Sequence, residues 1–152
     1  MKNKKKYLIC VFVVLIVVLS GCDDNYISSI PNYAVSLQLN LTSTYSTFKN
    51  SVNQYLIFDK PVNANDLIGF GGVLVYTGFD GNYYAFDLAC PHEAPEQNLK
   101  VIPNDEGKAV CETCGTVYNI SFGIGDPIEG PSKETLKRYK TSPQGDWLII
   151  TN

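Results

Sequence analysis

The β-forming residues of this chain come in short runs, and turn sequences separate each run from the next. The clearest pair is 72–77 and 82–88, which flanks Gly78-Phe79-Asp80-Gly81, where the Asp-Gly step supplies the positive φ angle of a tight hairpin. No stretch of helical length keeps an apolar stripe with a 3.6-residue period. The sequence therefore predicts an all-β fold, an antiparallel sandwich or barrel. Further strands are predicted at 35–41, 54–58, 99–102, 108–111, 117–120, 136–140 and 147–151.

The first residues have the composition of an export signal. Four lysines lie among the first six residues, and the apolar run over 7–19 that follows is short for a membrane-spanning helix. The run ends in Leu19-Ser20-Gly21-Cys22, which resembles the lipobox of bacterial lipoproteins, where the cysteine is acylated and becomes the first residue of the mature chain. We therefore expect a signal at 1–21, a polar tether at 22–32 and a folded domain at 33–152. The alternative is an uncleaved anchor in which Cys22 has no role.

A lipid on Cys22 would hold the protein on a membrane of the bacterial cell envelope, although the sequence does not distinguish the inner from the outer membrane. Four of the twelve basic residues lie in 1–21, which leaves eight basic side chains against fifteen acidic ones, a net charge of −7. Such a surface disfavours nucleic acid as a partner.

The number of cysteines restricts the chemistry of the mature domain. Cys10 would leave with the signal and Cys22 would carry lipid, so the domain keeps Cys90, Cys111 and Cys114. Three thiols cannot all pair internally. In an exported protein, an odd set indicates a metal site, one disulfide with a free thiol, or an intermolecular bridge.

Two short motifs place soft ligands after predicted strands. Cys90-Pro91-His92 follows the long hairpin, and Cys111-Glu112-Thr113-Cys114 follows the strand at 108–111. Eighteen residues separate His92 from Cys111, which is enough chain to return the second loop beside the first. Because metal sites need ligands held on rigid supports, we predict one metal site made by Cys90, His92, Cys111 and Cys114.

The order of these residues resembles the Rieske iron-sulfur family. That family has Cys-x-His and then, after a similar gap, Cys-x-x-His-Gly, a small hydroxyl residue and a tyrosine. This chain has Cys90-Pro91-His92 and then Cys111-Glu112-Thr113-Cys114-Gly115-Thr116-Val117-Tyr118, and its Gly130-Pro131 is similar to the family's proline loop. The resemblance implies a Rieske-like β-domain in which two loops form a metal-binding subdomain.

The resemblance also implies roles for single residues. Cys90 and Cys111 would bind one iron of a [2Fe-2S] cluster and His92 the other, with Cys114 in place of the family's second histidine. Thr116 and Tyr118 would donate hydrogen bonds to sulfur and stabilise the reduced cluster. Because thiolate adds negative charge, the reduction potential should fall below the Rieske range of about −150 to +300 mV, toward the about −400 mV of all-cysteine ferredoxins.

We therefore expect a membrane-tethered [2Fe-2S] electron carrier with an unidentified redox or protein partner. One alternative is a structural or interaction lipoprotein in which the same loops hold zinc, because Cys3His is an ordinary zinc set. The lysine-only signal favours this alternative, since it implies export of an unfolded chain without a cluster. Another is a Cys111–Cys114 disulfide with Cys90 free. No catalytic residue is predicted, because the sole histidine lies in the metal loop.

Overall fold

The computed structural model describes residues 28–96 and 98–152. The predicted signal, the lipidation site Cys22 and the first residues of the tether lie outside this range. Within it, none of the secondary structure is a helix long and apolar enough to cross a membrane.

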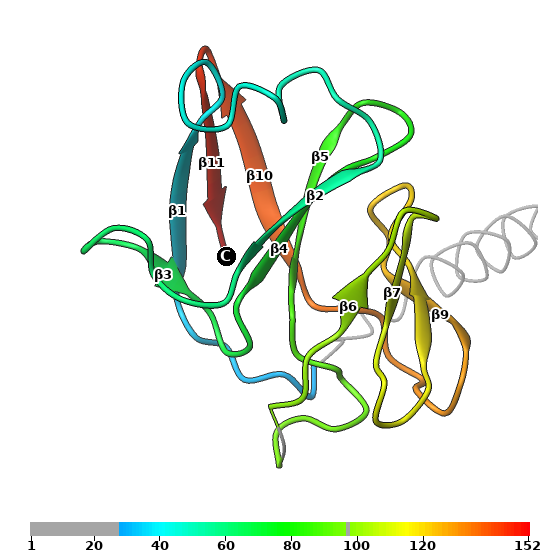
Figure 1. The fold of residues 1–152 in the computed structure, drawn as a ribbon. Helices are drawn as coiled ribbons and strands as arrows, with labels where there is room; N and C mark the ends of the chain where they lie inside the picture. The colour runs from blue at the N-terminus through cyan, green and yellow to red at the C-terminus, as the bar shows by residue number, and fades with distance from the viewer. Residues whose placement is uncertain (1–27, 97) are drawn as a thin grey trace, which may run out of the picture.

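The described chain is all-β, as predicted, and every strand pair is antiparallel (Figure 1). A seven-stranded sheet has the order β2-β4-β5-β10-β11-β1-β3, and a four-stranded sheet, β6-β7-β8-β9, lies beside it. The strands are β1 (Val35–Asn40), β2 (Gln54–Phe58), β3 (Leu67–Ile68), β4 (Val73–Thr77), β5 (Tyr83–Asp87), β6 (Ile102–Pro103), β7 (Lys108–Val110), β8 (Val117–Asn119), β9 (Asp126–Glu129), β10 (Arg138–Gln144) and β11 (Trp147–Thr151).

The predicted long hairpin is confirmed as β4 and β5. Its register runs from Val73 opposite Asp87 to Thr77 opposite Tyr83, and Gly81 in the turn has a φ of 78°. All five residues of β4 are buried, because the strand is covered on both faces. Alternate side chains therefore enter two different hydrophobic cores.

The two cores divide the domain. One lies inside the curled seven-stranded sheet and takes Val73 and Val75 from β4. The other lies between β4–β5 and the small sheet, and it takes Leu74 and Tyr76 from the opposite face of β4. The second core also contains Cys90 and Cys111, with Cys114 packed against it. The cysteines are thus part of the contact between the two sheets.

The sequence prediction differs from the structure in three places. Residues 99–101 lie outside strand β6, although a strand was predicted over 99–102. Cys90 N donates to Leu99 O and Val101 N donates to Leu88 O, both at 2.8 Å. This stretch therefore runs beside the end of the long hairpin. Strand β10 begins at Arg138 rather than at 136 and extends to Gln144. Strands β3 and β9 were not predicted, because β3 has two residues and β9 contains Pro127, which an edge strand tolerates.

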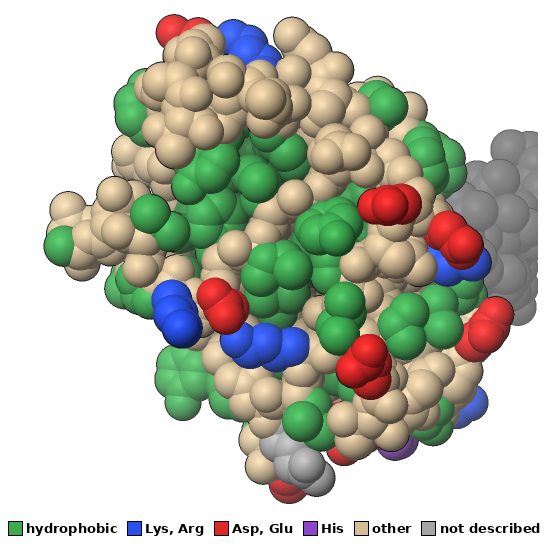
Figure 2. Space-filling view, in the orientation of Figure 1, with side chains coloured by type: hydrophobic (Ala, Val, Ile, Leu, Met, Phe, Trp, Pro, Cys, Tyr) green, Lys and Arg blue, Asp and Glu red, His purple; other side chains and the backbone are tan. Residues whose placement is uncertain are grey.

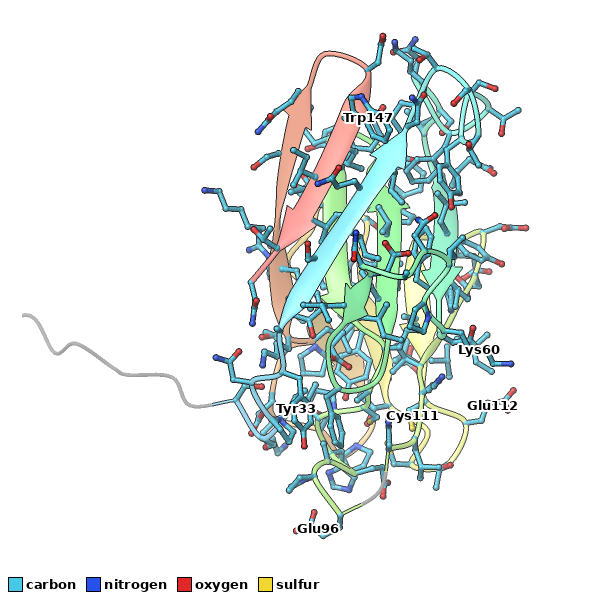
Figure 3. All side chains as sticks on the ribbon, turned by 90° about the vertical axis from the view of Figure 1, so that its left-hand side faces the viewer. Tyr33, Lys60, Glu96, Cys111, Glu112 and Trp147 are labelled. Atoms are coloured by element: carbon cyan, nitrogen blue, oxygen red, sulfur yellow. The ribbon has the colours of Figure 1, made fainter. Side chains whose placement is uncertain are left out.

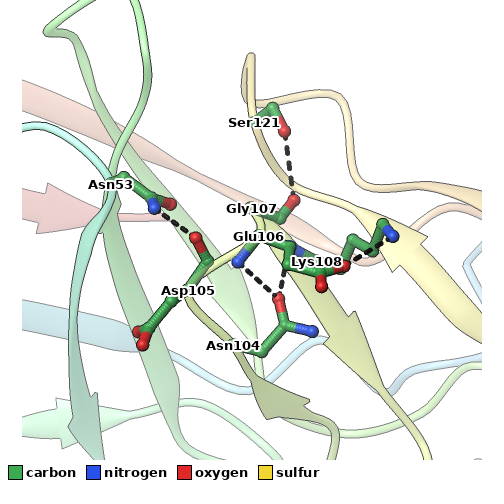
Figure 4. A network of polar contacts seen from close by, with 7 residues as sticks. All are labelled: Asn53, Asn104, Asp105, Glu106, Gly107, Lys108 and Ser121. Atoms are coloured by element: carbon green, nitrogen blue, oxygen red, sulfur yellow. Dashed lines mark hydrogen bonds and ion pairs between the residues drawn. The ribbon is translucent and has the colours of Figure 1, made fainter.

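The turn between β6 and β7 lies at the end of the small sheet that is far from the cysteines, and hydrogen bonds hold it in place. Asn104 Oδ1 accepts hydrogen bonds from Glu106 N and Lys108 N at 3.0 and 3.1 Å (Figure 4). Ser121 Oγ donates to Gly107 O at 3.2 Å, and Asn53 donates to Asp105 O. Strand β7 therefore runs from an anchored turn at one end to Cys111 at the other.

A buried carboxylate organises the chain just before Cys90. Asp87 is fully buried and accepts hydrogen bonds from the backbone N–H groups of Phe70, Gly71 and Ala89 at 3.1, 3.0 and 2.7 Å. The Tyr139 hydroxyl donates to the same carboxylate at 2.5 Å. Burial, and then the contact with Asp87, raises the pKa of Tyr139. Asp87 therefore joins the 70–71 loop, strand β10 and the end of β5.

Replacing Tyr139 by phenylalanine should lower the free energy of unfolding by about 1.5 to 3 kcal/mol, because it removes a hydrogen bond to a buried charged group. Urea denaturation followed by fluorescence measures this. The matched control is Tyr55→Phe, since Tyr55 lies exposed on edge strand β2 and should change stability little. Equal stability of the two variants would contradict the structural role of the Asp87 network.

The first described residues pack against the end of the domain that carries the cysteines. Ile30 is buried with Ala89 and Ala94, which flank Cys90 in sequence. Ser29 donates hydrogen bonds from N and Oγ to the Glu134 carboxylate, and Lys137 Nζ donates to Pro31 O at 2.9 Å. Figure 3 shows Tyr33, Cys111 and Glu112 toward one end of the domain and Trp147 at the other.

The surface seen in Figure 2 mixes hydrophobic, acidic and basic side chains. Basic and acidic groups lie close to one another on this face. Among the described residues, Lys100 Nζ and Asp59 Oδ2 form an ion pair at 4.0 Å. On this face the basic side chains are not gathered into one patch.

Candidate metal centre

Each cysteine loop turns back on its own first cysteine. After β5, Glu93 N and Ala94 N both donate to Cys90 O, at 3.1 and 3.0 Å. After β7, Gly115 N donates to Cys111 O at 2.8 Å, and Cys111 N donates to Thr116 O at 2.9 Å. Gly115 has a φ of 73°, which lets the second turn close. Backbone hydrogen bonds thus fix both loops at the end of the second core.

The three thiols of the described residues meet at one point. The Sγ atoms of Cys90, Cys111 and Cys114 all lie within 4.8 Å of one another, and those of Cys90 and Cys114 are 3.7 Å apart. Cys90 and Cys111 are fully buried, whereas Cys114 is half-buried. The prediction that two loops bring these cysteines together is confirmed, and the cluster could hold a metal.

The separation of 3.7 Å between Cys90 and Cys114 is the separation of two ligands of one ion. A tetrahedral ion with metal–sulfur bonds of about 2.3 Å places two thiolate sulfurs about 3.8 Å apart. Soft thiolates select zinc, copper(I) and iron-sulfur clusters over magnesium or calcium. The donor set therefore fits a thiophilic metal centre.

The fourth predicted ligand lies apart from the thiols. His92 is exposed and is not part of the three-cysteine cluster. Together with Pro91 and Ala94 it lines a surface cavity of about 320 Å³, whose other side is formed by Ser29 and residues 131–134. His92 thus lies at the surface, outside the three-cysteine cluster.

The two predicted hydrogen-bonding residues contact the cysteines. Tyr118 is fully buried, and its hydroxyl oxygen lies 3.3 Å from Cys90 Sγ. Thr116 Oγ1 lies 3.2 Å from Cys114 Sγ and accepts a hydrogen bond from Ser132 N at 3.2 Å. The Cys114 thiol donates to the same Thr116 oxygen, so Thr116 Oγ1 joins the second cysteine loop to the chain at Ser132.

These contacts and burial set different proton affinities for the thiols. Burial raises the pKa of Cys90 to about 12, although Tyr118 acts in the opposite direction. Burial also acts to raise the pKa of Cys114, but hydrogen bonds with Thr116, Cys111 and Cys90 together outweigh it and the pKa is lowered. Burial, followed by the contact with Cys90, raises the pKa of Tyr118. Burial therefore favours the neutral thiol at Cys90 more than at Cys114.

Ser132 and Asp87 are not among the site residues that the sequence predicts. Gly130 has a φ of 93°, and a Cβ atom there would lie 2.5 Å from Thr116 Cα, so the chain at 130–132 passes directly over Thr116. Ser132, in the same segment, is buried and donates its backbone N–H to Thr116 Oγ1. The sequence feature that could have pointed to Ser132 is the Gly130-Pro131-Ser132 run. The feature that could have pointed to Asp87 is an acidic residue within the mainly apolar strand predicted at 82–88.

No family model and no curated protein matches this chain. Among solved structures, it is similar to the quaternary ammonium Rieske monooxygenase CntA, with 13% sequence identity and a TM-score of 0.50 over 78% of this chain and 31% of that one. A complex of the oxygenase and ferredoxin of carbazole 1,9a-dioxygenase is 21% identical with a TM-score of 0.39, over 65% of this chain and 28% of that one. The chain spans less than a third of either protein. The first similarity confirms the predicted Rieske-like fold.

Proposed function

We propose that this chain is an electron-transfer protein in which Cys90, His92, Cys111 and Cys114 hold a [2Fe-2S] cluster. The observation that carries the proposal is the meeting of three thiols at one point, at the end of a core of a Rieske-like fold. A [2Fe-2S] cluster takes four ligands, and three thiolates with one imidazole supply that number. When bound, it supplies the capacity to take up and release one electron.

The protein's own groups are arranged to support thiolate ligands. The Tyr118 hydroxyl beside Cys90 and the Thr116 hydroxyl beside Cys114 can each donate to a sulfur that has lost its proton. Burial of Cys90 and Cys111 excludes water from one side of the site. The half-buried Cys114 and the exposed His92 form the side on which an electron partner would come close.

Electron paramagnetic resonance during a redox titration tests this function. Protein prepared without oxygen should show a rhombic signal on reduction, with a midpoint potential between about −400 and −150 mV, because three of the ligands are thiolates. Absence of a one-electron signal from protein that contains iron and sulfide would contradict the proposal.

The sulfur spacing favours a second candidate, a single structural zinc ion. A separation of 3.7 Å suits two thiolates on one tetrahedral ion, and Cys111 lies within 4.8 Å of both sulfurs. In the zinc case the site joins the two loops and transfers no electron.

His92 is the expected fourth ligand in either case. His92→Ala should weaken metal retention at least about tenfold, because one of four ligands is lost, and His92→Cys should restore retention by supplying a thiolate. Metal retention is measured by competition with a chelator of known affinity. His92→Ser is the control for His92→Cys, because serine has about the size of cysteine but no thiol. Unchanged retention in His92→Ala would show that the fourth ligand comes from elsewhere.

We further propose that the domain is held at a membrane of the bacterial cell envelope by a lipid on Cys22. The support is the lysine-rich, apolar start of the chain and the Leu19-Ser20-Gly21-Cys22 sequence. Cys22→Ala should abolish the incorporation of a labelled fatty acid into the protein, because the acyl chains that would hold it on the membrane are attached at this cysteine. An Asn25→Ala variant is the control and should be labelled like the wild type. Labelling of Cys22→Ala equal to that of the control would contradict lipidation at Cys22.

A further inference from the structure

Two of the three clustered thiols are placed to react with one another. Cys90 and Cys114 come from different loops, 24 residues apart in the chain, and their free sulfurs lie 3.7 Å apart. A disulfide needs a separation of about 2.05 Å, so the two sulfurs must approach by less than 2 Å. The turn that carries Cys114 lies at the surface, since its residues Glu112, Thr113 and Gly115 are exposed.

We propose that Cys90 and Cys114 form a reversible disulfide when the site carries no metal, and that this disulfide closes the site to metal. The bond itself depends only on the thiol geometry, whereas its regulatory consequence rests on the metal site of the proposed function. The cysteine pair differs from the Cys111–Cys114 pair that sequence spacing suggests.

Burial decides the order of the reaction. Cys114 is half-buried and can meet a bulky oxidant, while Cys90 and Cys111 are fully buried and cannot. The Cys114 thiolate therefore attacks first, and Cys90, as the neighbouring thiol, completes the exchange. Cys111 remains a free thiol beneath the bond.

The oxidant is a disulfide, either a small molecule such as oxidised glutathione or an exported protein disulfide. The Cys114 thiolate attacks one sulfur of oxidised glutathione, whose S–S bond breaks and releases a glutathione thiolate. The Cys90 sulfur, after giving up its proton, attacks the Cys114 sulfur of the mixed disulfide and releases the second glutathione. Two protein thiols are oxidised to one disulfide, one glutathione disulfide is reduced to two thiols, and two protons pass to them.

Loop length favours this pair over its rival. Cys90 and Cys114 are 24 positions apart in the sequence, whereas Cys111 and Cys114 are three positions apart. A Cys90–Cys114 bond therefore closes a much longer loop. A cross-link restricts the unfolded chain more when the closed loop is longer, so the Cys90–Cys114 bond stabilises the fold more. It also joins the end of the long hairpin to the β7–β8 turn, which the metal would otherwise join.

Peptide mapping distinguishes the possible bonds. Lys100 and Lys108 lie between Cys90 and Cys111, and neither lysine nor arginine lies between Cys111 and Cys114. Full-length protein is stripped of metal, treated with oxidised glutathione, alkylated and digested with trypsin. A Cys90–Cys114 bond joins two tryptic peptides, and fragmentation assigns its sulfur to Cys114. A Cys111–Cys114 bond stays inside one peptide.

The expected result is the joined pair of peptides, in wild type and in Cys111→Ala, and its loss in Cys114→Ala. A bond inside the single peptide, glutathione retained on Cys114, or three alkylated cysteines would each overturn the proposal. Uptake of Zn²⁺ supplied alone is then measured before and after reduction with dithiothreitol. Oxidised protein should take up none and reduced protein should take up zinc.

These readouts keep the two proposals separate. Zinc uptake by the oxidised, cross-linked protein would overturn closure of the site. If the cross-link forms and the reduced protein takes up no metal, the proposed function fails while the disulfide stands.

Discussion

Replacing Cys111 by alanine should abolish metal binding in protein that otherwise folds. The Cys111 sulfur is one of three thiols within 4.8 Å of one another, so the variant leaves only two of these thiols at the site. Loss of a ligand costs more than loss of a hydrogen-bonding neighbour, which alone lowers metal affinity about 10- to 100-fold. Metal content of the purified protein should therefore fall to the level of an unrelated protein.

The fold should survive this substitution because the turn is held by backbone groups. Cys111 N donates to Thr116 O and Cys111 O accepts from Gly115 N, and alanine keeps both hydrogen bonds. Circular dichroism checks that the β-sheet signal is unchanged. The matched control is Ser121→Ala, a substitution of a buried polar residue at the far end of the small sheet, which should keep full metal content. Equal metal content in both variants would show that the metal, if any, binds elsewhere.

Removal of the metal should lower the melting temperature by more than about 10 °C. A ligand present at about a thousand times its dissociation constant stabilises the folded state by about 4 kcal/mol, and each kcal/mol corresponds to about 4 °C in a domain of this size. A metal held by the three cysteines would join the end of the long hairpin to the β7–β8 turn, and both belong to the core between the two sheets. Differential scanning calorimetry with and without a strong chelator measures the change.

The metal-free protein should still unfold cooperatively, because both hydrophobic cores are complete without the metal. Adding metal back under reducing conditions should restore the melting temperature. Cys111→Ala is the control, since its melting temperature should not respond to the chelator. A wild-type melting temperature that is the same before and after chelation would contradict a metal that joins the loops.

Local sequence rules predict the fold where pairing is short-range. The Asp80-Gly81 turn determines the β4–β5 hairpin, and alternation of apolar residues from Val35 predicts β1. The same rules miss β9, because Pro127 argues against a strand and only its place at a sheet edge permits one. They also misplace 99–101, whose partner is the end of β5 rather than the next strand.

The candidate site, like the fold, can be predicted only in part from local sequence. The spacing of Cys90, Cys111 and Cys114 predicts the cluster, because each motif follows a strand that ends at the same edge. The exposure of His92 and the crossing of Gly130 over Thr116 depend on how distant loops pack, and no local pattern in the sequence specifies this. The Asp87 network likewise joins three segments far apart in the chain.

Analysis of iron, zinc and acid-labile sulfide, together with the visible spectrum, tests the proposed electron carrier most directly. The protein is purified without oxygen from cells that make it naturally. The account predicts brown protein with iron and sulfide in equal amounts, and loss of both in Cys111→Ala. Colourless protein that contains zinc and no iron would contradict the electron carrier, and protein that contains no metal would contradict the metal centre itself.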